Sequence, residues 1–201
     1  MFTEPSNKRV AVFFDGQNLF HAVRNAFGTP YPNFNVVALS KLVAARSGWE
    51  LGGIHTYTGL PSAAESPRWR GFWVLKLSEM RRHGVRTVSR DLVYRTETTF
   101  GPGGKRMRVR VGQEKGIDVR IALDVVRLAR EDAYDVAVLF SQDQDLREVA
   151  SEIRAIARMQ GRWIKIASAF PVGSGTRFSR GIDRTDWLPI TREEYERCLE
   201  G

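Results

Sequence analysis

Arg9-Val10-Ala11-Val12-Phe13-Phe14-Asp15 is a short apolar run that ends in a carboxylate. A run of this length without polar alternation is typical of a strand that is buried on both faces, as in parallel sheets. The later stretch Asp135-Val136-Ala137-Val138-Leu139-Phe140-Ser141 has the same character and is also followed by acids. These two runs predict a core built around a parallel sheet.

Helical and strand-like segments alternate along the rest of the chain. Asn35 suits the N-cap of a helix that should stop near Gly48. We expect helices over residues 19–26, 36–46, 67–83, 116–131, 146–160 and from 192 onwards, strands over 49–58, 85–88 and 163–167, and a short extended piece near 187–188. This alternation predicts an α/β domain whose sheet is mainly parallel and flanked by helices.

The 201 residues suggest one domain, residues 1–201. Period-2 alternation on both sides of Gly101-Pro102-Gly103-Gly104 predicts a β-hairpin over residues 96–112, and residues 171–201 are expected to form a C-terminal loop and helix. The single cysteine, Cys198, excludes an internal disulfide. No run approaches the ~18 apolar residues of a membrane span, and residues 1–9 lack a signal-peptide pattern. We therefore expect a cytoplasmic protein with no membrane partner.

Positive charge is concentrated in the middle of the chain. The formal net charge is +8, and the segment Arg68–Arg110 alone holds twelve basic and three acidic residues. Such a cluster predicts a face that binds a polyanion, although any single arginine could simply solvate an exposed surface. The aromatic residues among them (Trp69, Phe72, Trp73, Tyr94 and Phe100) could stack on bases, but the helical spacing of Trp69, Phe72 and Trp73 predicts that most of these rings lie in the core. The expected nucleic-acid contacts are Lys105, Arg106, Arg108, Arg110, Lys115, Arg81 and Arg82.

Carboxylates gather at the predicted strand ends. Asp15 ends the first apolar strand, and Asp143 and Asp145 follow the later one. Sites in open parallel sheets form outside the carboxyl ends of strands, so adjacent strands would bring these acids into one crevice. Asp118 begins the apolar stripe of the helix that starts at Gly116, so it either faces inward toward the site or caps that helix. Asp124 lies near the polar side of the same helix, as a surface or supporting group.

Gathered carboxylates need a counter-ion. At ~4 Å and an effective dielectric of ~20, each like-charged pair costs about 4 kcal/mol, so either protons are retained or a hard divalent cation binds. Oxygen ligands favour Mg²⁺ or Mn²⁺, and Cys and His are too scarce for a structural zinc site. The chain has no G-x-G-x-x-G after the first strand, no G-x-x-x-x-G-K-[ST] and no G-x-S-x-G. His21, His55 and His83 occur in unrelated contexts and are expected to be structural or exposed.

Three motifs together resemble the NYN domain family, which is similar to the PIN and flap-type 5′ nucleases. They are residues 12–19 (VFFDGQNL), 115–119 (KGIDV) with Ala122-Leu123-Asp124, and 141–146 (SQDQDL), and residues 182–188 resemble a weaker closing motif. The resemblance implies a PIN-like fold and a metal-dependent ribonuclease site. Its acidic positions match Asp15, Asp118, Asp143 and Asp145 as catalytic metal ligands, and Asn18 matches the polar residue of the first motif.

The chain also departs from the family pattern. Gln142 stands where a small residue is usual and would narrow the approach to Asp143, and the hairpin over 96–112 resembles an insertion. Ser141 and Asp124 are expected to support the ligands from behind, and Asn18 to orient a phosphate or water.

Three functions are compatible with these residues. The first is a Mg²⁺- or Mn²⁺-dependent endoribonuclease acting on single-stranded or structured RNA, with single-stranded DNA left open as a substrate and a second copy of the chain as a partner. The second is a non-catalytic RNA-binding module that keeps the acids for folding or weak metal binding. A phosphatase with an aspartyl nucleophile at Asp15 ranks last, because Gln17 stands where that class has a second Asp.

Overall fold

A computed structural model describes residues 2–31, 33–175 and 180–199. Its main sheet has six parallel strands in the order β3-β2-β1-β6-β7-β8, and a separate two-stranded antiparallel sheet is formed by β4 and β5. The strands are β1 (Arg9–Asp15), β2 (Glu50–Leu60), β3 (Arg86–Asp91), β4 (Val93–Phe100), β5 (Arg106–Gln113), β6 (Val136–Phe140), β7 (Lys165–Pro171) and β8 (Asp186–Ile190). The expected α/β class with a mainly parallel sheet is confirmed.

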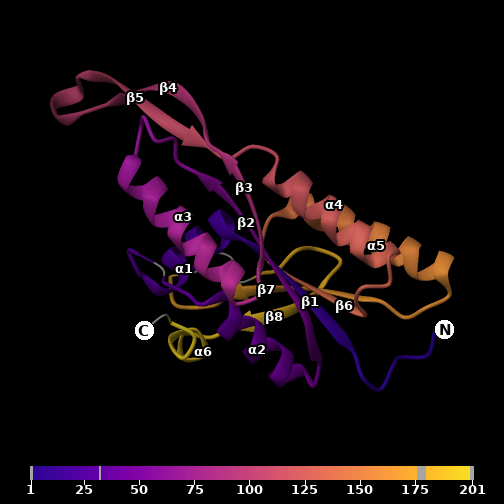
Figure 1. Cartoon of the computed structure of the whole chain (residues 1–201). Helices are drawn as coiled ribbons and strands as arrows, with labels where there is room; N and C mark the ends of the chain where they lie inside the picture. Colours follow the sequence, from indigo (N-terminus) through magenta and orange to yellow (C-terminus); the bar gives the residue numbers. More distant parts are fainter. Residues whose placement is uncertain (1, 32, 176–179, 200–201) are drawn as a thin grey trace.

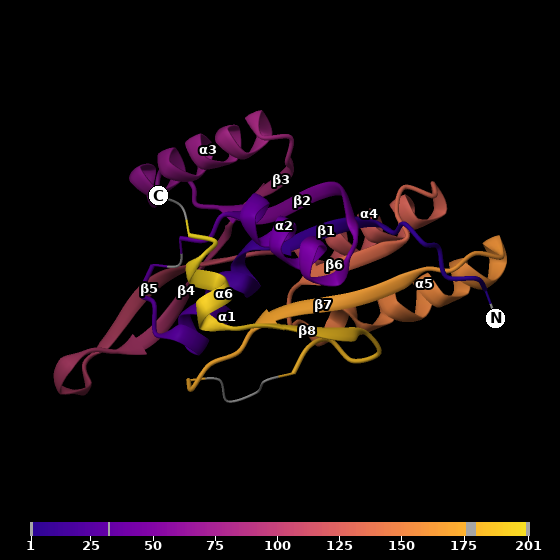
Figure 2. The same cartoon turned by 90° about the horizontal axis from the view of Figure 1, so that it is seen from below.

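Helices cover both faces of the main sheet (Figures 1 and 2). They are α1 (Gly16–Phe27), α2 (Val36–Ser47), α3 (Pro67–Arg82), α4 (Ile117–Arg130), α5 (Arg147–Gln160) and α6 (Arg192–Glu196), with 3-10 turns at Pro102–Gly104 and Gln144–Leu146. Residues of α1, α2, α3 and α6 share one hydrophobic core, and residues of α4 and α5 form the other. The fold is therefore a three-layer α/β sandwich.

Strand β1 lies in the centre because its sequence serves both cores. Val10, Val12 and Phe14 pack into the core under α1 and α2, whereas Ala11 and Phe13 pack into the core under α4 and α5. Side chains of a strand point alternately to its two faces, so only an uninterrupted apolar run can do this. The same reasoning applies to β6, all of whose residues are buried.

Local capping signals place the helix ends. Asn35 accepts hydrogen bonds from the backbone N–H groups of Val37 and Ala38, and Gly48 ends α2 with a left-handed φ of 67°. Both features match the sequence prediction. Helix α1 begins three residues earlier than expected, because the carboxylate of Asp15 accepts the N–H of Asn18 and caps the helix directly.

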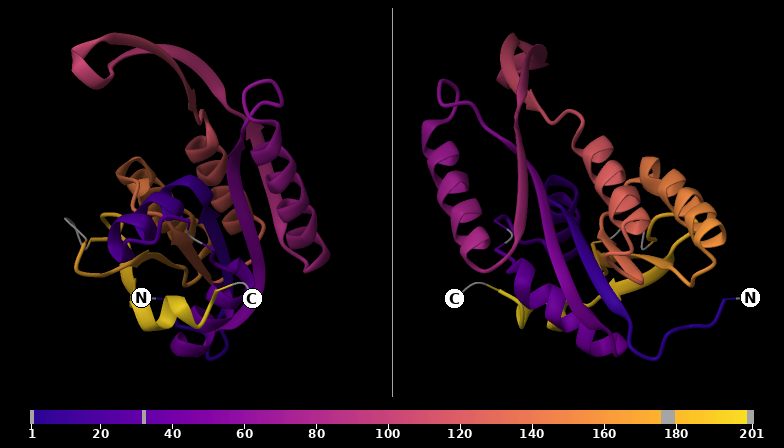
Figure 3. Two further views of the ribbon diagram at one scale, coloured as in Figure 1. Left: turned by 90° about the vertical axis from the view of Figure 1, so that its left-hand side faces the viewer. Right: turned by 45° about the vertical axis from the view of Figure 1, so that its right-hand side comes forward.

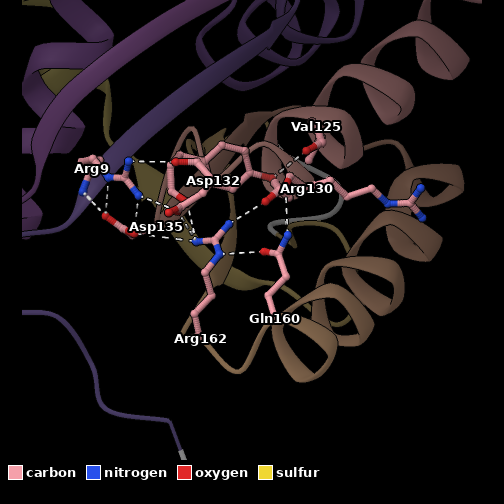
Figure 4. A network of polar contacts seen from close by, with 9 residues as sticks. Arg9, Val125, Arg130, Asp132, Asp135, Gln160 and Arg162 are labelled. Carbon is pink, nitrogen blue, oxygen red and sulfur yellow. Dashed lines mark hydrogen bonds and ion pairs between the residues drawn. The ribbon is translucent and has the colours of Figure 1, made fainter.

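A polar network closes the amino end of the sheet (Figure 4). The guanidinium of Arg9 donates to both carboxylate oxygens of Asp135, each at 3.0 Å, and to Asp132. Arg162 donates to the backbone carbonyls of Tyr134 and Ala129 and pairs with Asp132 at 3.2 Å. The two arginines hold the start of β1, the turn before β6 and the end of α5 together, and hydrogen bonds to Asp135 raise the pKa of Arg9.

The predicted hairpin is present as β4 and β5, spanning Val93–Gln113, and Figure 1 shows it extending away from the main sheet. Arg106, Arg108 and Arg110 lie opposite Phe100, Thr98 and Thr96, so all three share one face as expected. Contacts near its base hold the hairpin: the Tyr94 hydroxyl accepts the N–H of Ser62 at 3.2 Å, and Arg110 pairs with Glu65 at 2.8 Å.

The expectation that most aromatic rings of the basic segment lie in the core is wrong, because Trp69, Phe72 and Phe100 are all exposed. Trp69 is 50 % exposed and Phe72 is 46 % exposed, and only Trp73 packs partly against the core. The face of α3 that meets the body of the protein is narrow and is filled by Leu77 and Met80. In the described part of the chain, no helix is long and apolar enough to cross a membrane.

Candidate metal centre and nucleic-acid interface

The crevice of the sheet lies between β1 and β6. From β1 the chain continues to β2 and β3 on one side, while from β6 it continues to β7 and β8 on the other. Such a reversal of strand order opens a site outside the carboxyl ends of the two central strands. A cavity of about 550 Å³ occupies this position, and it is lined by Asp15, Gln17, Asn18, His21, Glu114, Lys115, Gly116, Ile117, Asp118, Val119 and Asp143.

Asp15 is the most enclosed of these acids, with 6 % of its surface exposed. Its carboxylate accepts the N–H of Asn18 at 3.1 Å and the hydroxyl of Ser141 at 3.1 Å. Burial raises the pKa of Asp15 to about 6, the two hydrogen bonds oppose this shift, and the charges of Asp143 and Asp118 add to it. A cation in the cavity would remove this cost, because it stabilises the ionised form.

Gly16 allows α1 to start directly beside Asp15. A Cβ at this position would lie 2.8 Å from the backbone carbonyl oxygen of Tyr57 in β2. The helix therefore begins so close to the sheet that only glycine fits.

Ser141 and Asn18 connect the two central strands at the cavity. The Ser141 hydroxyl donates to Asp15 and its oxygen accepts the N–H of Asp143 at 3.1 Å, and the Asn18 carbonyl oxygen accepts the N–H of Gln142 at 2.9 Å. Ser141 is thus hydrogen-bonded to both acids. Asn18 lines the cavity, but its oxygen positions the loop after β6.

The side chain of Gln142 turns away from Asp143. Its Nε2 donates to the carbonyl oxygen of Arg180 at 2.8 Å, and Gln142 is not among the residues that line the cavity. The expected narrowing of the approach to Asp143 is absent in this arrangement.

Asp118 enters the cavity from α4. Gly116, with a left-handed φ of 71°, is the N-cap of this helix, so Asp118 lies in its first turn and does not cap it. The buried stripe of α4 starts at Ile117, and the expectation that Asp118 begins it is wrong by one residue. Asp118 is half-buried at the edge of this stripe, where its carboxylate faces the cavity.

Asp124 is buried rather than on the polar side of α4. Its carboxylate accepts the Tyr57 hydroxyl at 3.0 Å and pairs with Arg120 at 2.9 Å and Arg127 at 3.4 Å. These partners do not line the cavity. Asp124 therefore joins α4 to β2, and any support that it gives to the site passes through Tyr57, which pairs with Asp15 in the sheet.

Glu114 is a site residue that the sequence analysis missed. It lines the cavity, and its carboxylate accepts the N–H of Gly59 at the end of β2. Burial raises the pKa of Glu114 to about 7, and the charges of Asp15 and Asp118 contribute. Its place in the sequence, immediately before Lys115-Gly116, was the available signal for a site residue. Its location at the cavity, however, depends on β5 leading straight into α4.

Asp145 differs from the other predicted ligands. It is exposed and does not line the cavity, because the 3-10 turn Gln144–Leu146 directs it outward, and its N–H donates at 3.0 Å to the carboxylate of Asp143, which caps that turn. The sequence-based convergence of four Asp residues is thus replaced by Asp15, Asp118, Asp143 and Glu114 around one cavity.

This arrangement suits a cation that keeps several water ligands better than a cation whose ligands all come from the protein. Among residues 2–31, 33–175 and 180–199, no three His, Cys, Asp or Glu side chains lie close enough to hold one ion between them. Mg²⁺ and similar ions usually keep several waters and bind through one or two carboxylates plus substrate phosphates. The all-oxygen set of acids around the cavity meets this requirement.

The basic residues fall into three places. Lys115 lines the cavity, and Lys105, Arg106 and Arg108 are exposed on the hairpin. Arg110 shares their face but is engaged by Glu65 and lies 5.7 Å from the Tyr94 ring. Arg81 and Arg82 are in the last turn of α3, on the side of the sheet opposite α4, and Arg81 donates to Thr87 at 2.6 Å.

Comparison with solved structures supports the fold alone, and this support comes from the first of the two matches that follow. A Vibrio parahaemolyticus protein of unknown function is 19 % identical with a TM-score of 0.56, and the match covers 96 % of this chain and 99 % of that one. A ribokinase from Giardia lamblia is 10 % identical with a TM-score of 0.41, covering 91 % of this chain and 55 % of that one. No curated protein matches the sequence.

A family model gives the assignment. The NYN domain model matches residues 9–176, a range that contains both central strands and every residue of the cavity. The expected resemblance is thereby confirmed. NYN domains are in general metal-dependent nuclease domains. Because the match spans well over half of the 201 residues, this chain belongs to the NYN domain family.

Proposed function

We propose that this protein is a divalent-metal-dependent endoribonuclease that hydrolyses phosphodiester bonds of single-stranded or structured RNA. The observation that supports this proposal most directly is that one cavity, at the crevice between β1 and β6, is lined by four acids: Asp15, Asp118, Asp143 and Glu114. Asp15 is buried and the other three acids are half-buried, and like charges placed together in this way are costly unless a cation binds among them. A solely structural role would not require four acids to face one cavity.

The chain's own residues hold the site in a fixed geometry. Asp15 is oriented by the Asn18 N–H and the Ser141 hydroxyl, and Asp143 by the N–H of Asp145. Asp15 and Asp143 would hold Mg²⁺ or Mn²⁺ directly or through water, with Asp118 and Glu114 also lining the cavity. When bound, such a cation activates a water nucleophile and offsets the charge that develops on the phosphate.

Positive residues would bring the substrate to this site. Lys115 is exposed at the cavity, where its ammonium can contact a phosphate next to the scissile one. Arg106 and Arg108 on the hairpin supply contacts farther along the strand. These contacts fix the position of the backbone and carry no sequence information.

Isosteric variants test the proposal. Asp15→Asn and Asp143→Asn retain the oxygen that accepts the capping N–H, so both should fold, but each removes a charge from the cation site. We expect loss of RNA cleavage by about 100-fold or more, because even outer partners of metal ligands contribute roughly 10–100-fold. Asp186→Asn, on the exposed end of β8 beside Lys165, is the matched control.

The assay uses single-stranded RNA in linear and circular form, with Mg²⁺, Mn²⁺ or EDTA. Cleavage of the circle identifies endonucleolytic activity. Cleavage that persists in EDTA, or equally in Asp143→Asn, would contradict the proposal. Binding of Mn²⁺ is measured separately as an increase in melting temperature, which should be lost in the two site variants.

A non-catalytic RNA-binding module is the second candidate. It is favoured by the absence, within the described residues, of any three acids close enough to hold one ion. Under this alternative the wild-type protein would bind RNA but cleave neither form with either metal. The same experiment therefore decides between the two functions.

A further inference from the structure

Four aromatic rings form a connected row on the outside of the protein. The centroids of Tyr31 and Trp69 are 6.5 Å apart with planes at 22°, those of Trp69 and Phe72 are 5.7 Å apart, and those of Phe72 and Trp73 are 5.8 Å apart. We call Tyr31, Trp69, Phe72 and Trp73 the α3 aromatic row. Tyr31 is 70 % exposed, and Trp69 and Phe72 are about half exposed at 50 % and 46 %.

The exposed rings are not needed to pack α3 against the rest of the protein. Trp73, Leu77 and Met80 fill the face of the helix that meets the core. Trp69 and Phe72 lie on its flank, and Leu75, three residues beyond Phe72, continues this flank with 72 % exposure. A contiguous exposed aromatic surface of this kind marks an interaction site.

The positive charge around the α3 aromatic row indicates which kind of ligand binds there. Helix α3 carries five basic residues and one acid, and the Lys76 ammonium lies 5.8 Å from the Phe72 ring. An interface between two copies of α3 would bring two strongly basic helices face to face, since a two-fold contact pairs the same patch on both partners. A polyanion with flat apolar groups matches both the rings and the charge. Unpaired nucleotides are such a ligand.

The start of α3, which carries Trp69 and Phe72, lies close to the hairpin. Helix α3 follows β2 after a short loop, and that loop contacts the hairpin through Ser62 to Tyr94 and Glu65 to Arg110. Figure 3 shows the start of α3 beside the base of the hairpin, on the edge of the sheet where β1 ends. One strand of nucleic acid could therefore contact the row, the hairpin and the cavity in turn.

We propose that the α3 aromatic row stacks on unpaired bases of single-stranded RNA and so restricts the substrate to unpaired segments. This inference rests on the proposed function, since it assigns the substrate class of that same site. Bases in a duplex are stacked on each other and cannot reach the rings, so only single strands should gain from the row.

Binding is measured in EDTA, so that cleavage does not interfere, by fluorescence anisotropy of a labelled unstructured RNA and of a hairpin RNA duplex. The test variants are Trp69→Leu and Phe72→Leu, which keep apolar bulk but remove the ring, and Trp69→Tyr, which keeps a stacking ring. Leu123→Ala is the control, an exposed apolar residue on α4. Thermal unfolding confirms that every variant folds.

We expect single-strand affinity to fall about fivefold to tenfold for each Leu variant, to stay within about twofold for Trp69→Tyr and Leu123→Ala, and duplex affinity to remain unchanged. The salt dependence should also stay the same, because no charge is removed. If the wild type binds and cleaves RNA but the Leu variants bind equally well, the row is not a base-stacking site although the nuclease proposal stands. If the wild type binds no single-stranded RNA, the inference fails, and the nuclease proposal is decided separately by the cleavage assay. A wild-type dimer that Trp69→Leu dissociates would identify a second copy as the occupant and overturn the inference.

Discussion

Replacement of Arg106 and Arg108 by alanine tests whether the hairpin contacts the RNA backbone. Both side chains are exposed on one face of β5. Arg110 shares this face but pairs with Glu65 at 2.8 Å, so it should release few counter-ions on binding. Each phosphate contact to a single strand contributes about 0.7 to the slope of log affinity against log salt. The double variant should therefore flatten the slope by about 1.4, and replacing Arg110 as well should flatten it no further, whereas three contacting arginines would give roughly 2.1 for the triple variant.

The assay is a titration of a labelled unstructured RNA in EDTA at salt concentrations from about 50 to 200 mM, the range over which such slopes are well defined. Over this range the wild type should lose about sevenfold more affinity than Arg106→Ala/Arg108→Ala. Arg158→Ala/Arg197→Ala removes the same number of charges from exposed positions on α5 and after α6, and it should keep the wild-type slope.

Two results would refute this reasoning. An unchanged slope in the double variant would mean that the nucleic acid does not contact the hairpin. If Arg110→Ala alone lowered the slope by about 0.7, the ion pair with Glu65 would not engage this arginine in solution.

Three further predictions concern stability. His55 is buried and stacked on Phe13, and burial lowers its pKa to about 4 from 6.5, so the unfolded state binds a proton at pH 5 that the folded state does not. Lowering the pH from about 8 to 5 should thus lower the free energy of unfolding, measured with urea, by about 2 kcal/mol through His55. His55→Phe should no longer show this part of the pH dependence, and a pH dependence equal to that of the wild type would disprove the prediction. Arg162→Ala removes the hydrogen-bond donors to two backbone carbonyls and should lower the free energy of unfolding by about 1–3 kcal/mol. Replacing the exposed Arg158 by alanine should lower it by less than about 0.5 kcal/mol, and equal losses in the two variants would contradict the stabilising role of the network. Gly16→Ala should lower the free energy of unfolding by about 1–3 kcal/mol, because the added methyl group moves the start of α1 away from Tyr57. It should also reduce the rise in melting temperature that Mn²⁺ causes. A variant with wild-type stability and normal Mn²⁺ binding would show that the contact between Gly16 and Tyr57 is not tight.

The sheet and its acidic edge could be predicted because they depend on local patterns. The run Val10–Phe14 must be buried on both sides, whatever its neighbours are, and Asp15 follows it directly. Asn35 and Gly48 end a helix through backbone chemistry that involves only adjacent residues. These signals do not depend on residues far away in the sequence, so they can be recognised without a structure.

The misplaced residues depend on tertiary contacts. Glu114 reaches the cavity only because β5 returns to the core at this point, and Asp145 leaves it because a 3-10 turn intervenes before α5. Trp69 and Phe72 have the spacing of a core stripe, but α3 is covered on one narrow side only. Periodicity shows which residues share a helix face, yet it does not show how much of that face another element covers.

The central position of β1 also has a consequence for synthesis of the chain. Its second neighbour, β6, is made much later: Arg9 and Asp135, which meet at the amino end of the two strands, are 126 residues apart. At ~5–20 residues per second, the ribosome needs about 6 to 25 s to make the intervening chain. During this interval β1 can pair with β2 only, and its other edge presents unpaired backbone groups beside exposed valine and phenylalanine side chains. Such an edge can pair with the same strand of another nascent chain. The topology that opens a crevice for the acids therefore also makes the first half of the chain prone to aggregation until the second half emerges.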